Sequence, residues 1–287
     1  MQSTTSPLIS PEVLAGRLAD PRLRIVDVRW YLGRPGDGRM AYDAGHIPGA
    51  IFLDIDGDLA IPPGPGRPGR HPLPDPGAFA RRLEATGIGD EHVVAVYDDV
   101  GGWVAARLWW MLDSLGHRDV VVLDGGFAAW LASGGAVSTD VPSFSLGRMS
   151  LAPEWDRTID REGLRARLGS VTVIDARGAP RYRGETEPID PVAGHIPTAF
   201  SAPTDGNVGP DGRFRTAEEL QARFAALGEP ARPVVTYCGS GVAACATALA
   251  MRVAGLPDPI LYPGSWSDWS TAGFPVATGA EPGDPPA

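Results

Sequence analysis

Short apolar runs that end in a turn recur along this chain. Residues 94–97 read Val-Ala-Val-Tyr and are followed by Asp98, and residues 234–237 read Val-Val-Thr-Tyr and are followed by Cys238-Gly239-Ser240-Gly241. A short apolar run predicts a buried strand, the glycines predict an abrupt turn, and the small residues at 242–253 predict a helix. Cys238 is therefore expected where a strand ends and a helix begins.

Each half of the chain carries the same three motifs in the same order. The first is an apolar run that ends in Asp-x-Arg, the second is Gly-His-Ile-Pro, and the third is an apolar run followed by a glycine turn and a tryptophan. The two copies lie at Asp27 and Asp175, at His46 and His195, and before Trp130 and Trp269. Amphipathic stretches at 76–86 and 216–227 predict helices between the strands. This alternation predicts a duplicated α/β fold, with a mainly parallel sheet flanked by helices in each copy.

Composition indicates where the domains begin and end. Residues 139–157 contain prolines, serines and glycine, and they show neither the helical nor the strand periodicity of apolar residues. Such a segment is typical of a linker. We expect an N-terminal domain at 8–138, a C-terminal domain at 158–278 and a disordered tail at 279–287. The glycine- and proline-dense residues 57–76 predict a long loop on the first domain, and such loops often have a function.

Charge narrows the classes of partner. The 287 residues include 35 acidic and 25 basic side chains, for a net charge of -10. This balance argues against a nucleic-acid or anionic-membrane partner. No apolar run approaches the roughly 18 to 20 residues that cross a bilayer, and the polar N-terminus lacks a signal pattern, so we expect a cytoplasmic protein. All the basic residues are arginine, which excludes Schiff-base chemistry by a lysine of this chain.

The two cysteines have different expected environments. Cys238 and Cys245 provide neither a disulfide framework nor a zinc-site spacing, and no metal or organic cofactor is expected. Main-chain amides of a tight loop and the positive end of a helix stabilise an anion, so the turn at Cys238 favours a thiolate rather than an inert buried thiol. Cys245 lies two helical turns further on among alanines, which predicts a core residue, with a resolving thiol as the alternative.

At this point the motifs carry a family resemblance. The loop from Cys238 to Ala244, the paired Asp-x-Arg and Gly-His-Ile-Pro motifs, and Pro263-Gly264-Ser265-Trp266 resemble the tandem rhodanese-domain sulfurtransferases over nearly the whole chain. That family includes thiosulfate sulfurtransferases and 3-mercaptopyruvate sulfurtransferases. It pairs a catalytic second domain with a first domain that has lost its cysteine, and Asp98 stands at the position of Cys238.

The resemblance implies a double displacement through a persulfide on Cys238. The persulfide cradle would be Gly239, Ser240, Gly241, Val242 and Ala243. Arg181 would bind the anionic group of the donor, and the alternative is a surface arginine paired with Glu185 or Glu187. Arg177, Asp175 and His195 have twins in the first half, which favours structural roles for them.

A proton relay is implied for one of the two donors. His46, Asp37 and Ser240 would pass a proton to the enolate that leaves from 3-mercaptopyruvate, whereas the duplication of the His46 turn favours a structural role. The loop at Ser240 resembles that of enzymes using 3-mercaptopyruvate. A second substrate arginine of those enzymes is replaced at residues 189–191 by Ile-Asp-Pro, and a loop threonine is replaced by Ala243.

These features favour 3-mercaptopyruvate slightly over thiosulfate as the small anionic donor, and the acceptor would be cyanide, a small thiol or a thioredoxin-like protein. Two other classes are less favoured. A cysteine phosphatase needs an arginine at the end of the loop, where this chain has Ala244, and a non-catalytic binding module would not need Cys238.

Overall fold

The chain forms two compact units, seen in a computed structural model that describes residues 6–62, 64, 66–227 and 232–286. Unit 1 comprises residues 1–61, 73–156 and 208–214, and unit 2 comprises residues 62–72, 157–207 and 215–287. Each unit thus includes a short segment from the other half of the sequence. Residues 62–72, which belong to the loop expected on the first domain, are part of unit 2.

Unit 1 is built on a parallel sheet of five strands in the order β1-β5-β4-β2-β3. Its strands are β1 (Leu8–Ile9), β2 (Leu23–Asp27), β3 (Ala50–Phe52), β4 (Val93–Tyr97) and β5 (Val120–Leu123). Its helices are α1 (Pro11–Ala15), α2 (Asp37–Ala44), α3 (Pro76–Ala85), α4 (Ala105–Ser114) and α5 (Gly126–Ala132).

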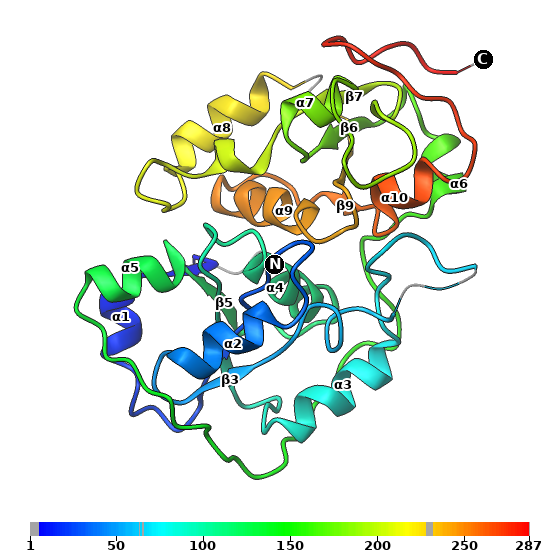
Figure 1. Ribbon diagram of the computed structural model, residues 1–287. Helices are drawn as coiled ribbons and strands as arrows, with labels where there is room; N and C mark the ends of the chain where they lie inside the picture. Colours follow the sequence, from blue (N-terminus) through cyan, green and yellow to red (C-terminus); the bar gives the residue numbers. More distant parts are fainter. Residues whose placement is uncertain (1–5, 63, 65, 228–231, 287) are drawn as a thin grey trace. The chain divides into compact units, whose positions relative to one another are not determined.

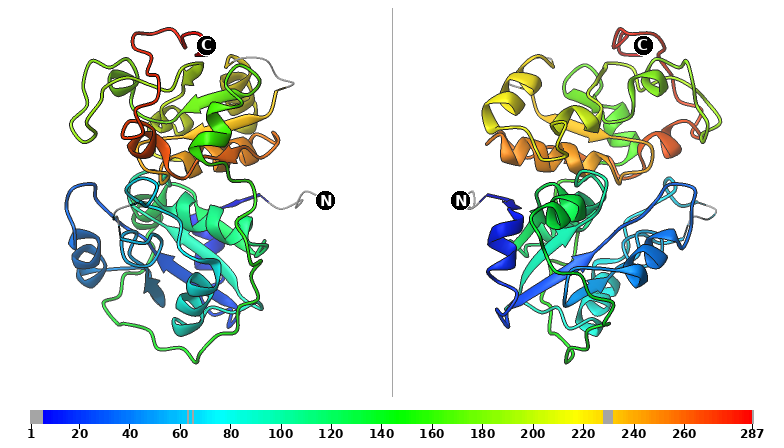
Figure 2. Two further views of the ribbon diagram at one scale, coloured as in Figure 1. Left: turned by 90° about the vertical axis from the view of Figure 1, so that its right-hand side faces the viewer. Right: turned by 60° about the vertical axis from the view of Figure 1, so that its left-hand side comes forward.

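Unit 2 repeats this plan with a parallel sheet of four strands in the order β7-β6-β8-β9. Its strands are β6 (Thr172–Asp175), β7 (Ala199–Ser201), β8 (Val234–Tyr237) and β9 (Ile260–Leu261). Its helices are α6 (Arg161–Arg165), α7 (Ala179–Tyr182), α8 (Ala217–Ala225), α9 (Ala244–Val253) and α10 (Ser265–Trp269), with a 3-10 turn, η1 (Thr204–Asn207). Helices flank both sheets (Figures 1 and 2), and the predicted duplicated α/β fold is confirmed.

Side-chain caps explain where several helices begin. Asp75 accepts a hydrogen bond from the amide of Ala78 at 2.8 Å, and the first residue of α3 is Pro76, which lacks an amide to satisfy. Thr216 and Glu219 form a reciprocal capping box at the start of α8. These polar residues therefore fix the helix ends that the amphipathic pattern located only approximately.

Matching tryptophans close the core of each unit. Trp130 in unit 1 and Trp269 in unit 2 are fully buried, and their indole nitrogens donate to the carbonyls of Ala136 and Pro275. Truncating a buried tryptophan typically costs about 3 to 5 kcal/mol. The repeated glycine–tryptophan motif thus serves the packing of each sheet against its last helix.

The C-terminal segment packs on unit 2. The amide of Gly279 donates to the carbonyl of Arg183, and the amide of Thr198 donates to the carbonyl of Pro282. Figure 2 shows this segment, in red, running along the unit. Ala287, the last residue of the predicted tail, lies outside the described residues. None of the helices in the described part of the chain is both long enough and apolar enough to cross a membrane.

Candidate active site

Cys238 lies directly after β8, at the carboxyl edge of the sheet in unit 2. The chain turns through Gly239, Ser240 and Gly241 before α9 begins at Ala244. The amide of Gly241 donates a hydrogen bond to the Cys238 sulfur at 3.2 Å, and the amide of Cys238 donates to the Ser265 hydroxyl at 3.1 Å. An amide aimed at the sulfur stabilises negative charge there, because it acts as a fixed dipole that needs no reorganisation.

Gly241 makes this turn possible. Its φ angle is +82°, and a Cβ at this position would collide with the carbonyl oxygen of Pro263. An L-residue would be strained by the backbone angle and blocked by rigid main chain. The glycine therefore lets its own amide approach the sulfur, as the sequence pattern suggested.

Both cysteines are free thiols, and they differ in their partners. Cys238 retains 3% of its surface exposed, whereas Cys245 is fully buried in α9. The Cys245 thiol donates to the carbonyl of Gly241 at 3.4 Å. The burial of Cys245 supports the core role that the sequence favoured. Its hydrogen bond to Gly241 also links α9 to the loop.

Unit 1 shows what the same turn does without a cysteine. Asp98 follows β4 as Cys238 follows β8, and its carboxylate is fully buried. One carboxylate oxygen accepts from the amides of Val100 and Gly102, and the other accepts from those of Val104 and Ala105, all at 2.8 to 2.9 Å. Burial raises the pKa of Asp98, and the four amides oppose that effect. The turn is thus an anion-binding nest that unit 1 fills with its own side chain.

Arg181 is the candidate donor-binding cation, and it is braced by two carboxylates. Its guanidinium contacts Glu187 at 2.6 and 3.1 Å and Asp190 at 3.2 Å. Its Nη1 lies 3.5 Å from the point that a Cβ on Gly239 would occupy. The structure therefore pairs Arg181 with Glu187, as the surface alternative proposed, and also turns one end of the guanidinium toward the Cys238 loop.

The two carboxylates have opposite pKa shifts. Burial raises the pKa of Asp190, and the nearby Arg70 and Arg181 lower it only in part. Burial also raises the pKa of Glu187, but the hydrogen bonds from Arg181 and from the amides of Asp190 and Ile189 outweigh it and lower that pKa overall. The environment therefore disfavours the ionised form of Asp190 and favours that of Glu187.

Arg70 and His71 lie at the same loop, and sequence reasoning did not select them. Nδ1 of His71 is 2.6 Å from the Ser240 hydroxyl, and Arg70 forms an ion pair with Asp190. The only sequence signal was their position in a long glycine- and proline-rich loop. The chain has five histidines, and His71 does not belong to either copy of the Gly-His-Ile-Pro motif.

The predicted relay residues in unit 1 have other partners. The ring nitrogens of His46 lie 2.8 Å from the Tyr42 carbonyl and 3.1 Å from the Asp140 carbonyl, and Asp37 pairs with Arg34. The structure does not place Asp37 against His46.

His195 in unit 2 repeats the His46 arrangement. Its ring nitrogens face the carbonyls of Tyr182 and Glu281 at the same two distances, 2.8 and 3.1 Å, and both histidines stack on a tyrosine. The duplicated contacts support the structural alternative for His46 and for its twin.

The Asp-x-Arg motifs brace the two sheets in the same way. Arg177 pairs with Asp175 at 2.7 Å, and Asp175 also accepts from the Tyr237 hydroxyl at 2.6 Å. Arg29 and Asp27 pair at 2.6 Å with Tyr97 in the equivalent place. These contacts support the structural reading of the duplicated motif.

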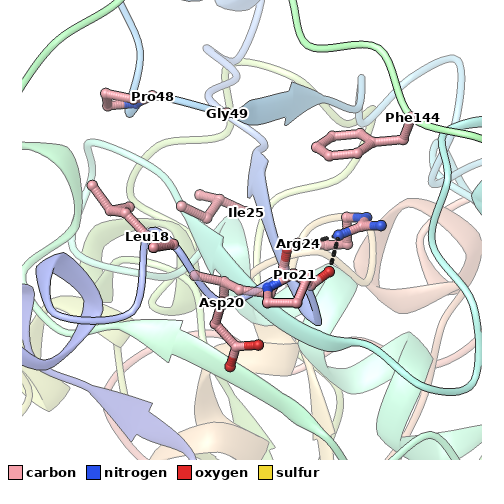
Figure 3. Close-up of a pocket in the computed structure, with 10 residues that line it drawn as sticks. Leu18, Asp20, Pro21, Arg24, Ile25, Pro48, Gly49 and Phe144 are labelled. Atoms are coloured by element: carbon pink, nitrogen blue, oxygen red, sulfur yellow. Dashed lines mark hydrogen bonds between the residues drawn. The ribbon is translucent and has the colours of Figure 1, made fainter.

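Unit 1 also contains a separate cavity of about 430 Å³ (Figure 3). Arg24 lies at its wall and donates to the carbonyls of Pro21 and Leu23. No cysteine, serine or histidine is present among the described residues that line it. Likewise, the described part of the chain contains no group of three or more acidic, histidine or cysteine side chains that could hold a metal ion.

Comparison with known proteins agrees with the fold. The family described as "Rhodanese-like domain" matches residues 10–133 and 160–272. A Pseudomonas aeruginosa protein named "Probable 3-mercaptopyruvate sulfurtransferase" is 47% identical over 282 residues, covering 96% of this chain and 99% of the relative. The bovine protein named "Thiosulfate sulfurtransferase" is 34% identical over 271 residues, covering 91% and 89%.

A solved structure of a sulfurtransferase also matches the fold of this chain. The 3-mercaptopyruvate sulfurtransferase from Leishmania major superposes with a TM-score of 0.84 at 30% identity, covering 96% of this chain and 76% of that one. Both halves of the chain thus match the same domain family. This chain belongs to the tandem rhodanese-domain sulfurtransferases, the thiosulfate/3-mercaptopyruvate sulfurtransferase family, and is a sulfurtransferase.

Proposed function

We propose that this protein transfers a sulfane sulfur from 3-mercaptopyruvate to a thiol or cyanide acceptor through a persulfide on Cys238. The observation that carries the proposal is the amide of Gly241 aimed at the Cys238 sulfur at 3.2 Å, in the turn where unit 1 holds a carboxylate. A nest that binds an anion in one copy supports a thiolate, and then a persulfide, in the other.

The first half-reaction forms one bond and breaks one. The Cys238 thiolate attacks the sulfur of 3-mercaptopyruvate, an S–S bond forms, and the C–S bond breaks with its electron pair leaving on the pyruvate enolate. The enolate then takes up a proton to give pyruvate. In the second half-reaction the acceptor attacks the outer sulfur, and the S–S electron pair returns to Cys238. Cyanide yields thiocyanate, and a thiol yields a new persulfide.

The proton for the enolate has a candidate source beside the cysteine. The Ser240 hydroxyl lies 2.6 Å from Nδ1 of His71, so the pair can shift a proton toward the leaving group. This contact supports Ser240 and His71 as the acid, and the relay through His46 and Asp37 stays a competing hypothesis.

Thiosulfate is the second candidate donor. Cys238 would attack its outer sulfur, the S–S bond of thiosulfate would break with sulfite as the leaving group, and the same persulfide would form. The similarity to the bovine protein named as a thiosulfate sulfurtransferase supports this alternative.

Intact-mass spectrometry tests the proposal directly. Wild type and the variants Cys238→Ala and Cys245→Ala are incubated separately with each donor, and excess donor is removed before the measurement. We expect wild type and Cys245→Ala to gain one sulfur atom and Cys238→Ala to gain none. A gain in Cys238→Ala that disappears in Cys245→Ala would move the chemistry to the second thiol and refute the proposal.

A further inference from the structure

Glu187 lies between the structural arginine of unit 2 and the candidate donor arginine. Its Oε2 accepts from Nη1 of Arg177 at 3.2 Å and from Nε of Arg181 at 3.1 Å, and its Oε1 accepts from Nη2 of Arg181 at 2.6 Å. The amides of Ile189 and Asp190 also donate to Oε1, both at 3.2 Å. The Glu187 side chain retains only 3% of its surface exposed, so these contacts fix both of its oxygens.

Arg177 is held by the residues around the cysteine turn. It pairs with Asp175, which accepts from the hydroxyl of Tyr237, the residue before Cys238. The Arg177 guanidinium also lies 4.4 Å from the centre of the Trp266 ring, and the Trp266 amide donates to the Cys238 carbonyl at 2.9 Å. Arg177 therefore has a fixed position relative to the cysteine.

Unit 1 has the same brace without the second acid. Arg29 pairs with Asp27 and lies 4.5 Å from the centre of the Phe127 ring. In the described part of the chain, Asp27 is the one carboxylate that forms an ion pair with Arg29. The sheet thus forms around the Asp-x-Arg pair without another carboxylate, whereas Glu187 is present in the unit that has Cys238. This difference favours a role for Glu187 at the site rather than in the fold.

Arg181 gains a defined geometry from the contact with Glu187. A mobile arginine side chain loses much rotamer freedom when it binds an anion. The two hydrogen bonds to Glu187 remove that freedom beforehand, and they leave Nη1 of Arg181 3.5 Å from the point that a Cβ on Gly239 would occupy. A preorganised cation binds an anion more tightly than a mobile one.

We propose that Glu187 is a positioning residue, which ties Arg181 to the structural brace of the sheet and so aims this donor-binding cation at Cys238. The inference rests on the proposed function, because the anion that Arg181 receives is the sulfur donor. Glu187 acts through Arg181 and takes no part in the bond-making steps.

Two variants of Glu187 separate its position from its charge. Glu187→Gln removes the negative charge, whereas Glu187→Asp keeps the charge and shortens the side chain by one methylene. If Glu187 acted through its charge alone, Glu187→Gln would strengthen anion binding, most of all for doubly charged thiosulfate, and Glu187→Asp would match wild type. Positioning predicts instead that both variants weaken anion binding.

Steady-state kinetics with both donors at a fixed cyanide concentration measure this effect. We expect both variants to raise the KM of either donor about fivefold to tenfold, with a much smaller change in kcat. Glu185→Gln is the matched control, because Glu185 is exposed and pairs with Arg183, and it should match wild type.

Alkylation of Cys238 tests the inference without sulfur transfer. Iodoacetate carries a carboxylate and iodoacetamide is neutral, so the ratio of their alkylation rates reports how well the site attracts an anion. The ratio should fall about fivefold in Glu187→Gln and in Glu187→Asp, and it should not change in Glu185→Gln. Cys245 is fully buried, and mass spectrometry confirms which cysteine is alkylated.

A double-mutant cycle checks that Glu187 acts through Arg181. In an Arg181→Gln background, Glu187→Gln should change the donor KM and the alkylation ratio by less than about twofold. A full effect in that background would overturn the inference, because Glu187 would then act by another route.

The outcomes separate this inference from the proposed function. Unchanged KM values and alkylation ratios in both Glu187 variants, or tighter anion binding in Glu187→Gln, would overturn the inference while Cys238 still gains a sulfur atom. If wild type gains no sulfur from either donor, the proposed function fails, and the alkylation ratios still decide whether Glu187 positions Arg181. Thermal unfolding of each variant is measured alongside, and Glu187→Asp decides if Glu187→Gln is unfolded.

Discussion

Asp98 and Cys238 occupy equivalent turns in the two units, and the Asp98 carboxylate lies where Cys238 has its sulfur. Each residue follows the central strand of its repeat, β4 or β8, and each accepts hydrogen bonds from amides of the residues that come next. The Asp98 carboxylate receives four such bonds, from the loop amides of Val100, Gly102 and Val104 and from Ala105, the first residue of α4. An aspartate at this position is therefore compatible with the loop, because its carboxylate oxygens accept the hydrogen bonds of the loop amides.

Asp98→Ala should destabilise the protein strongly. The substitution leaves four amides without their acceptor in a fully buried place, so we expect a loss of about 3 kcal/mol or more in the free energy of unfolding. Chemical denaturation measures the change. Asp43→Ala is the matched control, since Asp43 is exposed and pairs with Arg39 one helical turn away, and it should cost less than about 0.5 kcal/mol. Equal stabilities for the two variants would contradict the nest.

Two glycines of the cysteine loop should respond differently to alanine. Gly241→Ala places a Cβ against the Pro263 carbonyl at a φ of +82°, so we expect a stability loss of about 2 kcal/mol or more and a fall in kcat with both donors. Gly239→Ala meets only the flexible ends of Arg70 and Arg181, and should fold normally while raising the donor KM. Kinetics and thermal unfolding of the purified variants check both, and a Gly241→Ala protein as stable as Gly239→Ala would refute the steric argument.

The sequence predicted this loop because its signals are local. An apolar run of strand length, a cysteine and two glycines within four residues define the turn around Cys238, and the duplicate around Asp98 repeats the strand. Arg181 was located through the family resemblance, in the loop that follows the Asp175-x-Arg177 motif.

Arg70 and His71 left no comparable signal. Arg70 meets Asp190 across 120 residues, and His71 meets Ser240 across 169. Contacts at this separation depend on the path of a long loop, which has no periodicity from which its destination can be inferred. The same limit applies to Asp190. The sequence showed it only as a departure from an expected arginine and did not indicate its pairing with Arg70.

Removal of the His71 imidazole should affect one donor more than the other. An enolate needs a proton and sulfite does not, so His71→Asn should lower kcat with 3-mercaptopyruvate by about a hundredfold while changing kcat with thiosulfate little. Ser240→Ala should show the same selectivity. Single-turnover measurement of pyruvate release isolates the step.

His46→Asn distinguishes this route from the relay through His46 and Asp37. Because His46 and His195 share the same carbonyl contacts, we expect His46→Asn and His195→Asn to lower thermal stability alike, without selective loss of turnover with 3-mercaptopyruvate. A selective loss in His46→Asn with unchanged stability would favour the His46 relay instead.

Donor preference should also depend on pH through Asp190. Burial raises the pKa of Asp190 above its usual value of 3.8, so acidification neutralises Asp190 at a higher pH than it would neutralise an ordinary aspartate, whereas hydrogen bonds lower the pKa of Glu187 and favour its ionised form. A neutral Asp190 leaves Arg70 without its counter-charge while Glu187 still braces Arg181. In wild type the kcat/KM ratio of thiosulfate to 3-mercaptopyruvate should therefore rise as the pH falls toward the Asp190 pKa. The ratio should stay high and nearly flat in Asp190→Asn over the same range. Parallel pH profiles in the two proteins would show that another group controls the preference.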